Sequence, residues 1–95
     1  DTGVGGAVAA TIGKRLRELG RYHQVLCITH LPQVASQAQH HFSVEKLEVK
    51  GRTVATVRLL TGISREGEIA RMLGGERITA KTRSVAAELI AGTHE

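Results

Sequence analysis

Aromatic side chains are almost missing from this sequence of 95 residues. Tyr22 and Phe42 are the only two, and tryptophan is absent. Proteins that bind single-stranded nucleic acid without sequence preference stack successive bases on aromatic rings. The composition therefore argues against an aromatic stacking platform.

Cysteine and long hydrophobic runs are also scarce. Cys27 is the single cysteine, so an internal disulfide cannot form, which is compatible with a reducing compartment. No apolar run reaches the roughly 18 residues that a membrane-spanning helix needs. The first residues also lack the basic and apolar regions of a secretion signal. We therefore expect a soluble chain that is not secreted.

Positive charge is in modest excess. Thirteen Lys and Arg against nine Asp and Glu give a net charge of +4 and a pI near 9.8, which makes polyanions plausible partners. A chain of 95 residues is long enough for one domain or part of one. Because residues 1–6 read as a loop and do not begin with methionine, we expect residues 1–95 to form a single partial domain.

An amphipathic helix is predicted near the start. Over residues 7–19, apolar residues recur at helical spacing and basic residues lie off that stripe. Gly20 is well placed to end the helix. The apolar stripe, which should face a core, consists of Val8, Ile12, Leu16 and Leu19.

The most hydrophobic stretch predicts a buried strand. Four apolar residues follow one another within residues 24–29, the pattern of a strand covered on both faces. Each large side chain buried there would contribute about 1.5–3 kcal/mol, so this strand should anchor the core. Cys27 would then be core filler, and His30 would stand just beyond the end of the strand.

A short helix and a hairpin are predicted next. Pro32 suits the first turn of a helix, because its missing N–H would have no partner there. Residues 42–49 and 53–60 alternate imperfectly about Lys50-Gly51, which favours an antiparallel hairpin. The alternation slips near Leu47 and Val54, where we expect a bulge or an edge strand.

Two further helices are predicted near the end. Residues 64–73 form the first, which is stopped by Gly74-Gly75, and Thr79 offers its hydroxyl as the N-cap of the second. Together with the strand and the hairpin, they predict an α/β fold with about four helices. The residues expected on the inner faces of these two helices are Ile69, Met72, Leu73, Val85, Ala86, Leu89 and Ile90.

The opening loop is rich in glycine. Gly3, Gly5 and Gly6 precede the first helix, and such loops can present backbone N–H groups to an anion. The complete dinucleotide-binding and P-loop patterns both fail, because each needs glycine at Val8 and the P-loop also needs Ser or Thr at Arg15. For the loop taken alone, a flexible helix entry is the simpler interpretation.

His30 is the first candidate for chemistry. In open α/β sheets, ligands lie beyond the carboxyl ends of the strands, where His30 is expected. Its imidazole can donate to a phosphate oxygen or relay a proton near neutral pH. A strand-end histidine that hydrogen-bonds a neighbouring loop is the alternative, and the residues alone leave both open.

A zinc site is not expected. Cys27 and His30 are three residues apart, but on a strand this spacing puts them on opposite faces, and no paired cysteine motif is present. His23, His40 and His41 do not complete a recognised ligand pattern.

Basic residues of the first helix are candidates for contacts with DNA phosphates. Their alternative interpretation is an ordinary solvated helix face. These residues are Lys14, Arg15, Arg17 and Arg21.

Three segments carry a resemblance to a known family. They are DTGVGG at residues 1–6, LCITHLPQVA at 26–35 and EIARMLGG at 68–75. In this order they closely resemble the RecN family of bacterial DNA double-strand-break repair proteins, which belongs to the SMC group of ABC-type ATPases. The resemblance spans nearly the whole chain.

The resemblance implies the C-terminal part of a P-loop ATPase head. The Walker A loop, the signature motif and the Walker B acidic pair would lie outside these residues. ATP and Mg²⁺ would be ligands of the complete protein, with none held tightly by residues 1–95 alone. The implied partners are the remainder of the same head, a second head in an ATP-dependent dimer, and DNA. The implied location is the cytoplasm, on the nucleoid and not at a membrane.

The resemblance also implies roles for individual residues. His30 would be the switch histidine, which contacts the γ-phosphate or the attacking water. The D-loop region, which reaches the partner head, would be Asp1, Thr2, Gly3, Val4, Gly5 and Gly6. Gly5 stands where many relatives carry an aspartate, which leaves backbone contacts to this loop. Phosphoryl transfer also needs a phosphate-cradling loop, a magnesium ligand and a water-orienting acid, so we expect residues 1–95 alone not to hydrolyse ATP.

Two other functions stay open. One is a stand-alone basic module that binds nucleic acid or a protein partner through the first helix and the hairpin. The other is the head of a different SMC or ABC ATPase. If the chain is part of an ATPase head, of the RecN family or of another, its incomplete sheet would expose apolar surface. We therefore also expect self-association.

Overall fold

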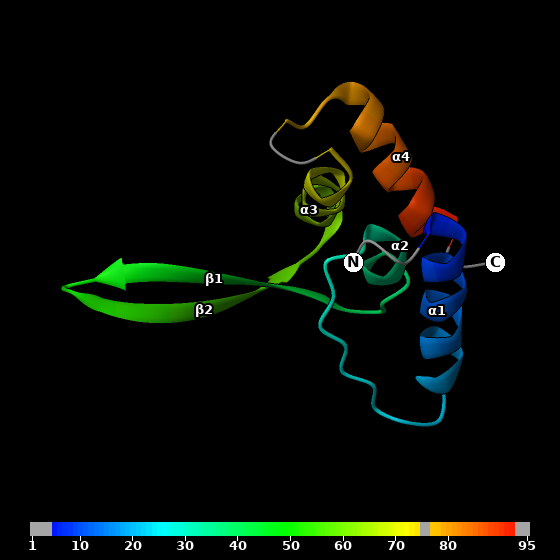
Figure 1. Ribbon diagram of the computed structural model, residues 1–95, viewed down its shortest axis with the longest axis horizontal. Helices are drawn as coiled ribbons and strands as arrows, with labels where there is room; N and C mark the ends of the chain where they lie inside the picture. The colour runs from blue at the N-terminus through cyan, green and yellow to red at the C-terminus, as the bar shows by residue number, and fades with distance from the viewer. Residues whose placement is uncertain (1–4, 75–76, 93–95) are drawn as a thin grey trace.

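The computed structural model describes residues 5–74 and 77–92. Within these ranges the chain forms four helices and one hairpin, which confirms an α/β chain with the expected helices and hairpin. Figure 1 shows the hairpin extending away from the helices. The elements in order are α1 (Gly6–Leu19), α2 (Pro32–Ala35), β1 (His41–Val49), β2 (Arg52–Leu60), α3 (Gly62–Gly74) and α4 (Ala80–Ala91).

The hairpin is regular along its whole length. β1 and β2 are antiparallel, and every residue of one strand has a direct partner in the other. Lys50 and Gly51 have φ angles of 51° and 76°, and two successive left-handed residues form the tight turn that matches the twist of paired strands. The bulge expected near Leu47 and Val54 is wrong, because these residues pair directly. Both strands are edges of a two-stranded sheet.

The imperfect alternation of the hairpin has a structural explanation. Directly paired residues share a face, and the faces alternate along each strand. The apolar residues therefore occupy one face near the base of the hairpin and the other face near its tip. The residues near the base are Phe42, Val44, Val57 and Leu59, and those near the tip are Leu47, Val49 and Val54.

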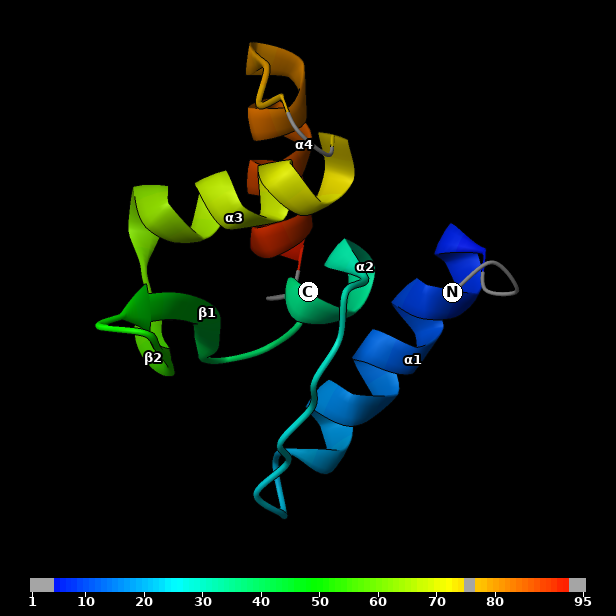
Figure 2. The same cartoon turned by 60° about the vertical axis from the view of Figure 1, so that its left-hand side comes forward.

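The main core lies between α3 and α4. Ile69 on α3 and Ala86 on α4 are completely buried, and Ala35 of α2 joins them. Figure 2 shows α3 crossing α4, with α2 beneath the crossing. The inward positions expected for both helices are largely confirmed, because the residues packed against this core are Met72, Leu73, Leu89 and Ile90. Val85 is more exposed than expected.

Local signals set the ends of two helices as expected. Thr79 Oγ1 accepts a hydrogen bond from the Thr82 N–H at 3.1 Å, and Thr82 Oγ1 accepts one from the Thr79 N–H at 2.9 Å. This reciprocal pair satisfies donors that a helix start leaves unpaired. Pro32 occupies the first turn of α2.

The first helix packs through its small residues. Ala9 and Gly13 are the buried residues of α1, whereas Val8, Ile12 and Leu19 are close to half exposed. The expectation that the large apolar stripe faces the core is therefore wrong. α2 approaches the narrow Ala9–Gly13 side of α1, and within residues 5–74 and 77–92 the broad apolar side has no comparable cover.

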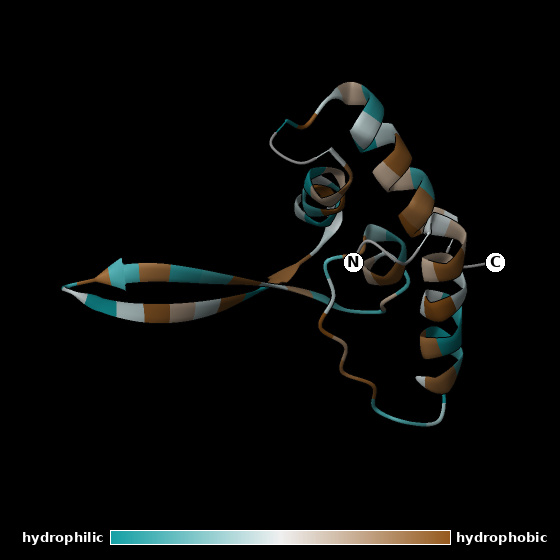
Figure 3. Cartoon of the chain, in the orientation of Figure 1, coloured by the Kyte–Doolittle hydropathy of each residue, from teal (hydrophilic) through white to brown (hydrophobic). Residues whose placement is uncertain are grey.

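The predicted buried strand is also wrong. Residues 24–29 are extended but form no strand, and Cys27 is exposed and is not core filler. Leu26 and Ile28 are 89% and 97% exposed, and Figure 3 shows this hydrophobic stretch lying along the connection between α1 and α2. A strand needs a hydrogen-bonded neighbour, and in the described part of the chain β1 and β2 pair only with each other.

No helix in the described ranges is long and apolar enough to cross a membrane.

Candidate functional site

His30 lies at the junction between the extended segment and α2. Its side chain is exposed, and its backbone forms a bend. The Leu31 N–H donates to Thr29 Oγ1 at 3.0 Å, so a side-chain hydrogen bond spans His30. Threonine often closes a local turn in this way. The imidazole is thus accessible to a ligand, while the backbone on both sides of it is held in a turn.

The segment after His30 is joined to α2 by backbone hydrogen bonds. The Leu31 carbonyl accepts from the Val34 N–H at 3.1 Å and from the Ala35 N–H at 3.0 Å. Leu31 is also the N-cap residue of α2, with an extended conformation. The position of α2 therefore determines where the chain leaves His30.

The glycine-rich opening lies beside this segment. Of the expected D-loop residues, Asp1, Thr2, Gly3 and Val4 lie outside the described residues, whereas Gly5 and Gly6 lie within them. A Cβ atom added at Gly6 would lie 3.6 Å from Gln33 Nε2. Two segments far apart in sequence, the start of α1 and the residues after His30, are therefore neighbours.

Gly13 allows α1 to approach α2 closely. A Cβ atom at this position would lie 2.8 Å from the Gln33 carbonyl oxygen and 2.9 Å from Gln37 Cγ. Such contacts are shorter than carbon atoms tolerate, so only glycine fits between the two helices. Sequence reasoning missed this contact, although glycine inside a helix, which is unfavourable by about 1 kcal/mol relative to alanine, is a signal of close packing.

Two arginines bind the carbonyl groups at the end of α2. Arg65 of α3 donates from Nη2 to the carbonyl oxygens of Ala38 at 2.7 Å, Ser36 at 3.1 Å and Ala35 at 3.4 Å. Arg17 of α1 donates from Nη1 to the Gln37 carbonyl oxygen at 2.7 Å. The last carbonyls of a helix have no partner within the helix. Here guanidinium groups from two other helices donate to the carbonyl oxygen of Ala35, the last residue of α2, and to those of the three residues that follow it.

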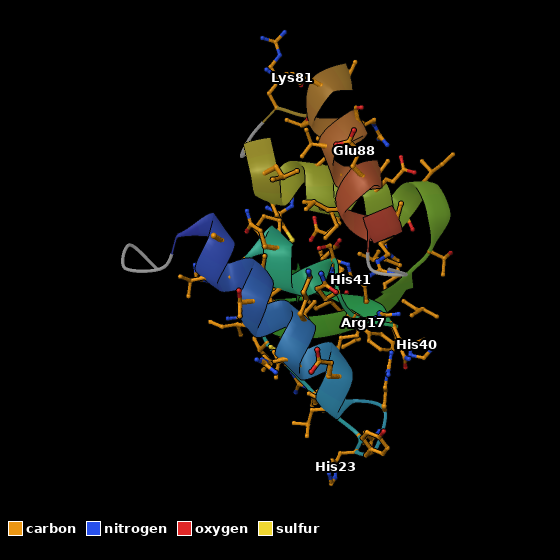
Figure 4. All side chains as sticks on the ribbon, turned by 90° about the vertical axis from the view of Figure 1, so that its right-hand side faces the viewer. Arg17, His23, His40, His41, Lys81 and Glu88 are labelled. Atoms are coloured by element: carbon orange, nitrogen blue, oxygen red, sulfur yellow. The ribbon has the colours of Figure 1, made fainter. Side chains whose placement is uncertain are left out.

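The arginines form a positive cluster with His41. Burial, and then the charge of Arg17, lowers the pKa of Arg65, which nevertheless stays protonated, as arginine does in proteins. Burial and the charge of Arg65 lower the pKa of His41, against an opposing effect of Glu68. Figure 4 labels Arg17 on α1 and His41 at the start of β1. His41 is therefore held toward its neutral form.

The four basic residues expected to contact DNA phosphates have different surroundings. Lys14, Arg15 and Arg21 are exposed, and Arg15 lies 3.6 Å from a carboxylate oxygen of Glu18. Arg17 is half-buried, and its guanidinium is engaged with α2. Lys14 and Arg15 on α1, and Arg21 in the turn just after it, are thus exposed to a polyanion.

The histidines do not gather into a metal site. Figure 4 shows His23 beyond the end of α1, far from His41. In residues 5–74 and 77–92, no three His, Cys, Asp or Glu side chains are placed to hold a metal ion together.

A hollow of about 450 Å³ lies between the hairpin and α3. Its lining combines acidic and basic side chains, among them Glu45, Arg58, Glu68 and Arg71, and His30 is not part of it. Arg71 forms a hydrogen-bonded ion pair with Glu68. Because its charges largely offset each other, this hollow has no clear preference for an anion.

Comparison with known proteins gives a consistent result. The chain is similar over 95 residues to DNA repair protein RecN of Xylella fastidiosa, with 46% identity over all of this chain and 17% of the relative. It is 50% identical over 92 residues to DNA repair protein RecN of Deinococcus radiodurans, which covers 97% of this chain and 16% of the relative. The protein of the same name from Haemophilus influenzae is 42% identical over 94 residues, or 99% of this chain and 17% of the relative. The chain therefore spans about one sixth of the length of these curated relatives. No family model matches it.

Proposed function

Since this chain belongs to the RecN family of DNA repair proteins, we propose that it supplies the histidine edge of an ATP-hydrolysing head. His30 would donate to the γ-phosphate of ATP or to the attacking water. The rest of the head would come from the part of RecN proteins that this chain does not span. A second head would complete the site, and its engagement would be coupled to DNA double-strand-break repair.

One observation carries this proposal. The exposed His30 begins the segment that lies beside the start of α1, through the approach of Gly6 to Gln33. The first N–H groups of a helix carry partial positive charge and attract anions. A helix start beside the segment that begins at His30 is an arrangement that suits a phosphate group.

The exposed apolar surfaces support the same proposal. Leu26 and Ile28 precede His30 and are almost fully exposed, and α1 also exposes Val8 and Ile12. Soluble domains rarely leave such surfaces without a function in binding. If a neighbouring strand from the rest of a head paired with residues 24–29, His30 would stand at the carboxyl end of a sheet strand, where ligands of open α/β sheets bind.

The remaining parts of the proposed site have separate sources. Bound magnesium neutralises phosphate charge in such reactions, and its ligands would be supplied by the rest of the head. Gly5 and Gly6 have no side chains, so the described part of the opening loop can contribute only backbone groups. Lys14, Arg15 and Arg21 are exposed candidates for contacts with DNA phosphates.

The role of His30 is tested in a full-length RecN-family protein that carries this segment. The His30→Ala variant should lose at least about 100-fold in steady-state ATP hydrolysis, the usual scale for removing a proton-transferring group. His23→Ala, which removes an exposed histidine beyond α1, is the matched control and should keep its turnover. Unchanged hydrolysis by a folded His30→Ala protein would refute the assigned role.

The 95-residue chain alone provides a complementary test. It should show no magnesium-dependent ATP hydrolysis above the level of its own His30→Ala variant, because it lacks the groups that bind the phosphates and orient water. Measurable turnover that depends on His30 would show that the chain contains a complete site.

A further inference from the structure

α2 is too short to hold itself in place. It has four residues, whereas isolated helices of fewer than about 12 residues are marginal in water. Its geometry must therefore be imposed by contacts with other elements. His30 lies two residues before this helix, so any freedom of α2 is transmitted to the histidine.

Arg65 makes several of these contacts. A single nitrogen of its guanidinium, Nη2, is within hydrogen-bond distance of three carbonyl oxygens that follow one another closely at the end of α2. Hydrogen bonds to charged groups are roughly twice as strong as those between neutral groups. Arg65 thus replaces the residues that would otherwise continue or cap the helix.

Arg17 and Gly13 hold α2 from the opposite helix. The Arg17 guanidinium donates to the Gln37 carbonyl oxygen at 2.7 Å, and Gly13 lies directly against Gln33 and Val34. α2 is therefore fixed between α1 and α3. Both arginines donate to backbone carbonyl oxygens of residues 35–38, so the function that these contacts support is to hold α2.

We propose that Arg65, assisted by Arg17, is a positioning residue for His30. This inference rests on the proposed function of His30 and adds the contacts that fix the position of His30. The connection runs from the guanidinium to the carbonyls at the end of α2, through the helix to the Leu31 carbonyl, and from there to the turn around His30. Each step is a hydrogen bond or one short helix.

The shape of arginine is essential to this role. Its guanidinium is planar and rigid, whereas lysine has a compact ammonium on a flexible chain. Arg65→Lys therefore keeps the positive charge near His41 and removes the geometry that reaches the carbonyl groups. Arg71→Lys is the matched control, because Arg71 lies on the same helix and forms an exposed ion pair with Glu68.

The first measurement is amide hydrogen exchange in the full-length RecN-family protein that carries this segment. Arg65→Lys should speed exchange at residues 34–38 by roughly tenfold while leaving α4 unchanged, because a charged hydrogen-bond donor to this end of α2 is lost. Arg71→Lys should leave residues 34–38 unchanged. If exchange there is the same in the Arg65→Lys protein as in the parent, the positioning role is overturned, whatever His30 does.

The second measurement is a kinetic double-mutant cycle in the same protein. Arg65→Lys should lower kcat for ATP hydrolysis by roughly 10- to 100-fold with KM for ATP within about twofold, because a misplaced group affects the chemical step more than binding. The double variant with Arg65→Lys and His30→Ala should have a kcat within about twofold of that of His30→Ala alone. A purely structural role would lower kcat by the same factor in both backgrounds.

The outcomes separate the two proposals. If His30→Ala lowers hydrolysis by about 100-fold and Arg65→Lys lowers the residual rate by its full factor as well, Arg65 does not act through His30. This inference then fails while the proposed function stands. If His30→Ala hydrolyses ATP normally, the proposed function fails, and the positioning inference fails with it.

Discussion

Ile69 and Ile28 have the same side chain and opposite surroundings. Ile69 is completely buried between α3 and α4, whereas Ile28 is 97% exposed on an extended segment. The stretch around Ile28 is the more hydrophobic of the two in sequence, with three further apolar residues directly before it. Burial in this molecule therefore follows the presence of a partner element and not hydrophobicity alone.

The two regions differ in what they need from the rest of the chain. α3 and α4 are consecutive in the chain, and the core between them is formed largely by their own side chains. In the proposed head, a neighbouring strand would supply backbone hydrogen bonds and side-chain cover to residues 24–29. Within the described residues, the core between α3 and α4 is therefore buried, whereas Leu26 and Ile28 are exposed.

The largest expected effect is on the buried side of this comparison. Ile69→Ala should lower the free energy of unfolding of the 95-residue chain by about 2–5 kcal/mol, because it leaves a cavity in the core. Ile63→Ala, at an exposed position of the same helix, should change it by less than about 0.5 kcal/mol. Urea denaturation measures both. Similar losses for the two variants would show that α3 does not use one buried face.

The next effect concerns the contact between α1 and α2. Gly13→Ala should destabilise the chain by about 1–3 kcal/mol, because its methyl group would collide with the Gln33 carbonyl. Gly92→Ala is the control, since a Cβ there meets nothing within 4 Å. Thermal denaturation of the two variants gives the difference. A stabilised Gly13→Ala chain, as helix propensity alone would give, contradicts the close packing of the helices.

A smaller effect is expected from pH. The pKa of His41 is lowered below its ordinary value of 6.5 in the folded chain, by burial and by Arg65. As pH falls below 6.5, the unfolded chain takes up a proton that the folded chain resists, so the free energy of unfolding decreases. Because the site is partly open to solvent, the decrease should be less than about 1 kcal/mol.

The pH effect is checked by denaturation of the 95-residue chain at pH 7.5 and at successively lower pH. His41→Gln should flatten the dependence below pH 6.5, whereas His40→Gln, one residue earlier and exposed, should not. An unaltered slope in the His41→Gln chain would assign the dependence to other groups.

The smallest effect is expected on the exposed side of the comparison. Ile28→Ser should change the stability of the 95-residue chain by less than about 0.5 kcal/mol, because the side chain is already in water. The same substitution should reduce self-association, which light scattering over a range of concentrations would detect. A loss of stability comparable with that of Ile69→Ala would mean that Ile28 is buried.

Elements with local signals could be predicted from the sequence. The Thr79 cap, Pro32 at the start of α2 and the turn at Lys50-Gly51 each depend on residues within a few positions of one another. Their physical causes are short-range hydrogen bonds and allowed backbone angles. These predictions are confirmed for that reason.

Features that depend on distant residues could not be predicted in the same way. Arg65 binds carbonyl groups 27 to 30 residues earlier in the chain, and no pattern near it indicates those acceptors. The apolar stripe of α1 and segment 24–29 are predicted to be buried, but both are exposed. Hydrophobicity shows that burial of a side chain is favourable, but it does not show which element packs against that side chain. His30 could be proposed from its motif, whereas the arginines that fix the helix behind it could not.

The most direct test compares residues 24–29 in two settings. Their amide hydrogen exchange can be measured in the 95-residue chain and in a full-length RecN-family protein that carries the same segment. The proposed head requires fast exchange in the 95-residue chain and strong protection in the full-length protein, where a neighbouring strand would pair with the segment and place His30 at its end. Equally fast exchange in both proteins would contradict the proposal that the rest of the protein completes this edge.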